Sequence, residues 1–228
     1  MKSFKIFFIP AIIFLTTLAL YATFPSNQYT AVDGSLRCLP YMNSTKWELH
    51  GNNHMLYPVN VMLWSRIMAT LFNMKPKDPF DFIRIIELMN SFFAAVGVAM
   101  FFLILKKATS NIKISILGAC ALAFSNAFIV NAVNSNEPMV GFTISTLAII
   151  STYAWLKSDR IFLGFIGAFL LSFSMATYQS MFLIAPSLIA LSILFPYTRI
   201  ANTAIIRNAL TYISVSYTHL TLPTKRIV

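Results

Sequence analysis

Residues 85–105 read IIELMNSFFAAVGVAMFFLIL, an apolar run that ends at Lys106 and Lys107. A helix needs about 20 apolar residues to cross the roughly 30 Å hydrocarbon core of a bilayer. The run satisfies this length and carries a single acidic residue, Glu87, near its start. It therefore predicts a transmembrane helix and sets the fold class of the chain.

Comparable apolar stretches lie on both sides of this run. The chain is 57% hydrophobic and 11% charged, with a mean hydropathy of +0.71, which excludes an ordinary soluble domain. We predict an all-α fold, a polytopic transmembrane helix bundle. The predicted spans are 1–24, 85–105, 114–133, 139–156 and the region 161–196, which gives two spans (161–176 and 181–196) if the chain turns near Thr177-Tyr178-Gln179.

The first apolar run, 6–24, follows Lys2 and Lys5. A cleaved signal peptide begins in the same way. However, the run is about 19 residues long, which exceeds the usual apolar region of a signal peptide, and no small-x-small cleavage site follows it. We expect an uncleaved first span.

The net charge of +10 suggests nucleic acid at first sight. The basic residues stand at the ends of the spans, however, as the positive-inside rule requires, so we expect a membrane and no nucleic acid as partner. If the amino terminus is cytoplasmic, every short internal connection is basic. The acids Asp33, Glu48 and Glu137 are then external.

Residues 25–84 form the long external loop of this topology. Within it, 55–74 is apolar enough to be read as a span, yet it contains Pro58, Asn60 and Arg66. A span there would place Lys106 and Lys107 outside and reverse the charge pattern downstream. We therefore predict an amphipathic helix that lies in the outer interface.

The loop offers a first candidate for chemistry in Asp33. A carboxylate close to the bilayer is partly desolvated, which raises its pKa and suits a general base. The alternative is an Asp-Gly turn with Gly34.

His50 and His54 stand four residues apart around Gly51-Asn52-Asn53. That spacing is compatible with a metal site on a helix, with hydrogen bonding to a phosphate or sugar hydroxyl, or with a structural role. Tyr57 follows, as a pocket wall or as part of an interfacial aromatic belt. Cys38 and Cys120 lie too far apart in the predicted topology for a disulfide and show no metal-ligand spacing.

The short external connections carry further candidates. Glu137 lies in Asn134-Ser-Asn-Glu-Pro138 and is either a functional carboxylate at membrane depth or a helix cap before Pro138. Tyr178 and Gln179 lie at the predicted turn on the same side. Arg66 is the external cation best placed for a phosphate headgroup.

The last residues, 215–228, differ in character from the rest. Val215–Thr224 reads VSYTHLTLPT, which resembles the translation of an adapter used in DNA sequencing libraries. We expect a non-native tail, and a natural chain that continues past Ser214.

Three short motifs, together with Asp33 after the first span, resemble membrane glycosyltransferases of the GT-C class, which use polyprenyl-phosphate sugars. The motifs are Asn53–Pro58 before the interfacial helix, Asn136-Glu137-Pro138 at a span start, and Ala176–Ser180 at a turn. The resemblance covers roughly 5–196. It implies a bacterial inner (plasma) membrane protein, and the charge pattern predicts a cytoplasmic amino terminus.

By this resemblance, Asp33 is the catalytic acid that deprotonates the acceptor hydroxyl, with Glu48 as its substitute because Gly34 departs from the family's acidic pair. The implied substrate-binding residues are Glu48, His50, His54, Tyr57, Arg66, Glu137, Tyr178 and Gln179. The implied partner is a lipid-linked sugar donor. A cation or divalent metal would receive the charge of the leaving phosphate, although the sequence shows no ligand set for one.

Two other classes of protein fit the composition. The first is a transporter or flippase for a lipid-linked sugar, which would place charged or broken-helix sites near the midplane of the bilayer. The second is a non-catalytic polytopic protein of polysaccharide assembly. The clustering of acids on one side favours the glycosyltransferase.

Overall fold

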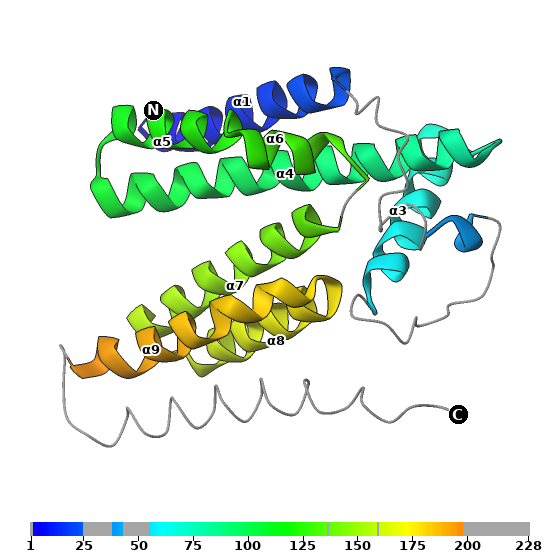
Figure 1. Ribbon diagram of the computed structural model, residues 1–228. Helices are drawn as coiled ribbons and strands as arrows, with labels where there is room; N and C mark the ends of the chain where they lie inside the picture. The colour runs from blue at the N-terminus through cyan, green and yellow to red at the C-terminus, as the bar shows by residue number, and fades with distance from the viewer. Residues whose placement is uncertain (1, 25–37, 43–54, 136, 159, 198–228) are drawn as a thin grey trace, which may run out of the picture.

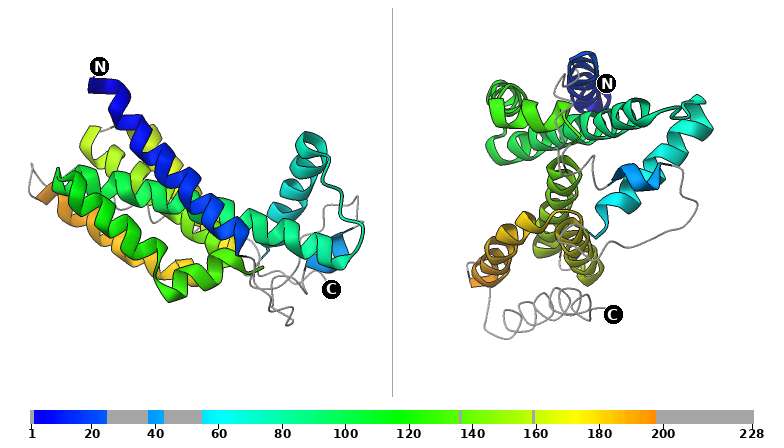
Figure 2. Two further views of the ribbon diagram at one scale, coloured as in Figure 1. Left: turned by 90° about the horizontal axis from the view of Figure 1, so that it is seen from above. Right: turned by 45° about the vertical axis from the view of Figure 1, so that its right-hand side comes forward.

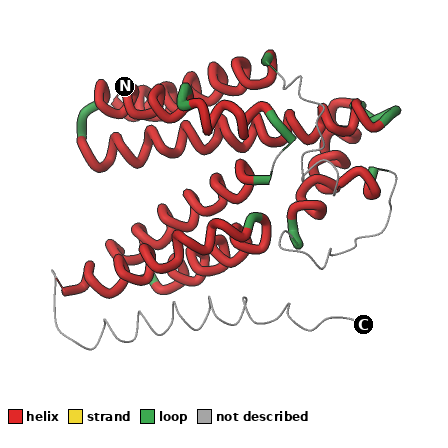
Figure 3. Tube along the Cα trace, in the orientation of Figure 1, coloured by secondary structure: helices red, strands yellow, loops and turns green. Residues whose placement is uncertain are grey.

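A computed structural model of the protein describes residues 2–24, 38–42, 55–135, 137–158 and 160–197. All regular elements in these ranges are helical (Figures 1 and 3), which confirms the all-α prediction for the described part of the chain. The elements are α1 (Lys2–Thr23), η1 (Leu39–Tyr41), α3 (Tyr57–Phe72), α4 (Pro79–Thr109), α5 (Ile112–Ala123), α6 (Asn126–Val133), α7 (Pro138–Ser158), α8 (Ile161–Thr177), η2 (Gln179–Leu183) and α9 (Ile184–Tyr197).

Two of the described helices, α4 and α7, are long and apolar enough to cross a membrane. Helices α5 and α6 pass the same test only when they are taken together as one span, and the two are bent by 61° at the break between them. The sequence predicts a continuous span over 114–133, and the structure interrupts it at Phe124 and Ser125. Ser125 favours this break, because its hydroxyl donates to the carbonyl of Leu122 in place of a continued helix.

Helix α5 ends with an ordinary helical bond, in which the amide of Phe124 donates to Cys120 O at 2.9 Å. The next carbonyl that lacks a helical partner, Ala123 O, is bonded from another helix. The hydroxyl of Tyr21, on α1, donates to Ala123 O at 2.8 Å, and its ring lies against Phe128 of α6. The bend is therefore fastened to α1 by a side chain that is 1% exposed.

The helices pack in two groups (Figures 1 and 2). The first contains α1, α4, α5 and α6, around a core that includes Ala94, Val98 and Ala119. The second contains α7, α8 and α9, around Ala148, Ala168 and Leu171. A third core joins them where α3 and the first turns of α4 meet α7; its buried members are Cys38, Tyr57, Val61, Phe82, Ile86, Met89, Val140 and Ile144.

Close contact between α7 and α8 depends on small residues. A Cβ atom at Gly167 would lie 2.6 Å from Thr152 Oγ1, 3.2 Å from Thr152 N and 3.3 Å from Ala148 O. The hydroxyls of Ser151 and Ser174 donate across the helix pair, to Leu163 O and Gly141 O, each at 2.8 Å. Small residues and interhelical hydrogen bonds are the usual means by which apolar helices pack closely.

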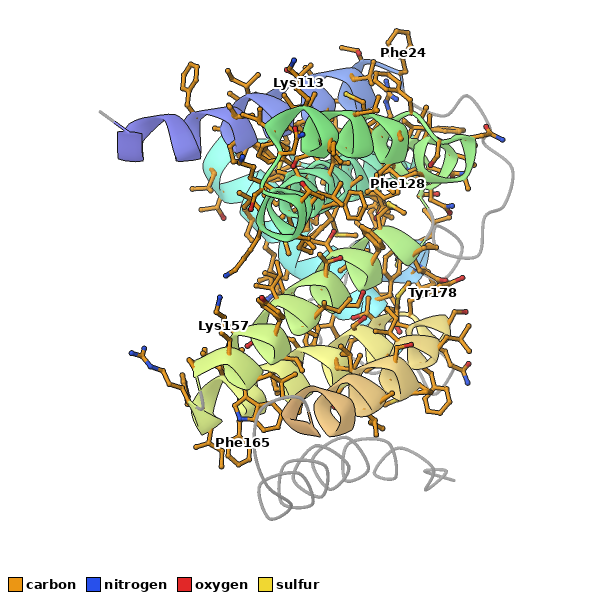
Figure 4. The ribbon with its side chains drawn as sticks, turned by 90° about the vertical axis from the view of Figure 1, so that its left-hand side faces the viewer. Phe24, Lys113, Phe128, Lys157, Phe165 and Tyr178 are labelled. Atoms are coloured by element: carbon orange, nitrogen blue, oxygen red, sulfur yellow. The ribbon has the colours of Figure 1, made fainter. Side chains whose placement is uncertain are left out.

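In the described part of the chain, the acidic residues lie at one end of the bundle and the turns at the other end are basic. Lys106, Lys107 and Lys113 flank the turn from α4 to α5. Lys157 lies in the last turn of α7, and Arg160 caps the start of α8. Both turns lie at the end that faces the viewer in Figure 4, where Lys113 and Lys157 are labelled. The described acids lie at the other end, at Asp78, Asp81 and Glu87 in the first turns of α4 and at Glu137 before α7.

At that second end, α3 stands apart from the long helices and runs across their direction (Figure 2). It ends at Asn73, whose φ of 54° is left-handed and whose amide donates to Met68 O. Its residues 57–72 fall within the range 55–74 for which the sequence predicts an amphipathic helix. Next, Asp78 caps α4 by accepting the amide of Asp81 at 2.8 Å.

We expect Gly167→Ala to destabilise the protein and Gly118→Ala to be tolerated. The new methyl at 167 meets backbone atoms of α7, whereas at 118 it meets Leu105 Cδ1, the end of a flexible side chain. Overpacking typically costs about 1–3 kcal/mol. Denaturation by sodium dodecyl sulfate, followed by tryptophan fluorescence, measures the difference. Equal stability of the two variants would contradict the close α7–α8 contact.

Candidate functional site

The connection between α6 and α7 forms the centre of a buried polar cluster. The last carbonyls of any helix have no hydrogen-bond donor within that helix. At the end of α6, side chains of α4 supply the missing donors. Ser91 Oγ donates to Ala132 O at 3.1 Å, and Asn90 Nδ2 donates to Asn134 O at 2.7 Å. Asn90 is 0% exposed. Two neighbouring side chains of α4 therefore fix the path of the chain toward Glu137.

Tyr57, the first residue of α3, enters the same cluster. Its side chain is fully buried, its hydroxyl donates to Ser135 O at 3.1 Å, and the side chain of Asn90 hydrogen-bonds it. Asn90 thus contacts both the connection and the phenol. One residue from each of α3, α4 and the α6–α7 connection meets here.

Glu137 stands directly before Pro138, the first residue of α7, and is 5% exposed. The amino-terminal end of a helix favours a negative charge, so this position suits a carboxylate. Its charge acts on the Tyr57 phenol, which places the two side chains in one electrostatic environment. A carboxylate held in such a position can bind a hydroxyl group or accept its proton.

Burial raises the pKa of the Tyr57 phenol well above its ordinary value. Negative charge on Cys38 raises the pKa further, the hydrogen bond from Asn90 lowers it, and the charge of Glu137 raises it again. Tyr57 therefore stays neutral at physiological pH, and its hydroxyl stays a donor to Ser135 O.

The end of α8 closes the cluster from the other side. Leu56 N donates to Ala176 O at 3.1 Å, and Asn60 Nδ2 donates to Thr177 Oγ1 at 3.2 Å. Tyr178 packs its Cβ against Gly141, one turn after Glu137 on α7. The segments 55–58, 137–138 and 176–178, each singled out in the sequence, are thus brought together.

The other predicted site residues are placed differently. Arg66 and Gln179 are exposed, and Arg66 lies nine residues after Tyr57, about 13 Å along α3. Asp33, Glu48, His50 and His54 lie outside the described residues. The described residues hold no group of three or more His, Cys, Asp and Glu side chains arranged for a metal ion.

Sequence reasoning missed Asn90, Ser91 and the pairing of Glu87. The Arg84 guanidinium lies 3.2 Å from the Glu87 carboxylate, which is 7% exposed. A signal was present, because Glu87, Asn90 and Ser91 are polar residues at helical spacing within an apolar run. Polar groups there are costly unless they face partners, so they mark an interior face.

Comparison with protein-family models, with curated proteins and with solved structures finds no match to this chain. The chemistry of the cluster therefore rests on its own geometry.

We expect Tyr57→Phe to lower the free energy of unfolding by about 1–3 kcal/mol, because Ser135 O loses a buried donor and Asn90 a buried partner. Thr23→Val is the control, since the Thr23 hydroxyl is exposed and bonds carbonyls within its own helix, Ala19 O and Leu20 O. Denaturant titration at neutral pH measures both. A loss no larger than that of the control would contradict the buried hydrogen bond.

A second expectation concerns pH. Because the folded pKa of Tyr57 is raised, its contribution to stability is complete below the ordinary tyrosine pKa of about 10 and is lost as the pH rises through the folded value. Wild type should therefore lose stability above about pH 10 more steeply than Tyr57→Phe. Identical slopes for the two proteins would contradict the raised pKa.

Proposed function

We propose that this chain belongs to a polytopic membrane glycosyltransferase of the GT-C kind. It would transfer a sugar from a polyprenyl-phosphate donor to an acceptor hydroxyl on the non-cytoplasmic side of a bacterial plasma membrane, with its amino terminus in the cytoplasm. The remaining apolar helices, α1, α8 and α9 together with the bent pair, would complete the spans around α4 and α7.

One observation carries this proposal. The residues that resemble the family's motifs meet in one cluster, at Tyr57, Glu137 and Tyr178. The cluster lies at the end of the bundle opposite the basic turns. The positive-inside rule would place those turns in the cytoplasm and the cluster outside, where a lipid carrier presents its headgroup.

The reaction assigns a role to each group. The acceptor oxygen attacks the anomeric carbon of the donor, the bond from that carbon to the phosphate oxygen breaks, and polyprenyl phosphate leaves with the bonding electrons. A base takes the proton of the acceptor hydroxyl. By the family resemblance this base is Asp33. Glu137 would orient a sugar or acceptor hydroxyl beside it, with Glu48, His50, His54 and Gln179 as further contacts.

The charge that develops on the leaving phosphate requires a positive group. Arg66 is exposed on α3 at the same end of the bundle, and it is the residue proposed for this task. A divalent metal would serve the same purpose.

We expect Asp33→Asn, in the full-length protein, to reduce sugar transfer by at least about 100-fold, since a positioned base contributes at least this factor. Insertion into the membrane should be unchanged. The measurement is transfer of radiolabelled sugar from a polyprenyl-phosphate donor. Normal transfer by the variant would remove Asp33 from the site.

Glu137→Gln should lower transfer by about 10- to 100-fold, which corresponds to the loss of one charged hydrogen bond of about 1.5–3 kcal/mol. Asp81→Asn is the control, because this acid is exposed in the first turn of α4. Both variants should fold, as judged by gel filtration in detergent. Equal activity of the two would refute the assignment of Glu137.

A lipid-linked sugar transporter is the second candidate, and the 61° bend between α5 and α6 is the observation that favours it. Broken helices commonly line the substrate sites of transporters. Reconstituted protein separates the two functions: movement of a fluorescent lipid-linked sugar across the bilayer without any transfer to an acceptor would support transport.

A further inference from the structure

Helix α3 has two apolar faces, and the described protein covers one of them. The covered face includes Tyr57, Val61 and Met68. Beside them, the ring of Trp64 lies tilted against that of Phe92 of α4, with ring centroids 5.1 Å apart. The other face carries a stripe at helical spacing. Its large members are exposed by 51%, 37% and 70% at Leu63, Ile67 and Leu71.

Charges of one sign border the exposed stripe. Residues 55–77 contain no acidic residue, while Arg66, Lys75 and Lys77 are exposed. The nearest acids that follow serve the start of α4, where Asp78 accepts the amide of Asp81 and Asp81 accepts the amide of Lys77. An apolar stripe flanked by basic residues is the pattern of a helix that lies in the surface of an anionic membrane.

The position of α3 agrees with this pattern. Helix α4 has 31 residues, about 46 Å at 1.5 Å per residue, against roughly 30 Å of hydrocarbon. The excess allows its first turns to stand outside the hydrocarbon. Helix α3 packs on these first turns, near Phe82 and Ile86, and runs across the long helices (Figure 2).

We propose that α3 docks on the outer surface of a bilayer that contains anionic lipid. The stripe of Leu63, Ile67 and Leu71 enters the headgroup region, and Arg66, Lys75 and Lys77 contact the lipid phosphates. The proposal rests on the proposed function only for the side of the membrane. A membrane surface explains the stripe better than a protein partner does, because the helix that follows is itself long and apolar enough to cross the bilayer.

Docking has a consequence for the candidate site. Residues 56, 57 and 60, in and just before the first turn of α3, bond to α8 and to the α6–α7 connection. The depth of α3 therefore sets the height of Tyr57 and Glu137 above the hydrocarbon.

The test measures the depth of spin labels on the full chain in vesicles of phosphatidylcholine and phosphatidylglycerol. Single cysteines replace Ile67 or Leu71 in a Cys120→Ser background, since Cys38 is fully buried. Ser110→Cys, in the exposed α4–α5 turn, is the control. We expect labels at 67 and 71 to be reached by oxygen more than by a water-soluble nickel chelate, at about 5–10 Å depth, and the control label to show the reverse.

A charge variant tests the headgroup contact. Arg66→Gln/Lys75→Gln/Lys77→Gln should make both labels shallower, and so should the omission of phosphatidylglycerol. Lys106→Gln/Lys107→Gln/Lys113→Gln, at the opposite end, should leave their depth unchanged.

Three results would overturn the proposal. Labels reached mainly by the nickel chelate would show that the face is in water and not docked. Labels at the bilayer centre would show that α3 spans the membrane. Labels shielded from both oxygen and the chelate would show that protein covers the face. If the depth of the labels at 67 and 71 stays the same when phosphatidylglycerol is omitted, the proposed contacts with lipid phosphates are wrong. The measurement involves no sugar transfer, so failure of the proposed enzymatic function would leave its result intact.

Discussion

The arrangement of this bundle depends on how it satisfies backbone carbonyls that its helices leave without partners. In an apolar environment such a carbonyl costs several kcal/mol unless a donor reaches it. Here side chains from other helices supply the donors: Tyr21 bonds Ala123 O, Asn90 bonds Asn134 O, and Tyr57 bonds Ser135 O. Each of these bonds joins segments that are far apart in the chain, so helix ends and tertiary packing are stabilised together.

The same constraint explains why the candidate site lies where it does. The chain leaves regular helix at the α6–α7 connection and at the end of α8, and polar side chains gather where it does so. Asn90 donates to Asn134 O and Tyr57 donates to Ser135 O, both in the α6–α7 connection. Glu137 shares their environment, so a carboxylate suited to chemistry is held by groups whose first role is structural. Closely packed helices on either side, with Gly141 against Tyr178, keep the cluster compact.

Particular residues show how far the sequence could predict the site. The sequence singles out Glu137 and Tyr178 because each stands at a short connection between apolar runs, and Tyr57 because it follows the His50–His54 pair in the long loop. Asn90 was missed because it lies inside such a run, where its neighbours Phe92 and Phe93 dominate the pattern. The bend at Ser125 was missed for a related reason: overall hydropathy continues unchanged across it, and only the hydroxyl bond to Leu122 O ends the helix. Asp33, Glu48, His50 and His54 remain predictions, since they lie outside the described residues.

The sequence by itself determined that the described chain is helical, and that two of its helices can cross a membrane, because length and hydropathy are properties of single segments. Only the tertiary structure decided which faces are used. The two apolar stripes of α3 are chemically alike, yet one packs against α4 and the other stays exposed. That choice depends on donors and small residues supplied by distant parts of the chain, and no local pattern encodes where those parts will lie.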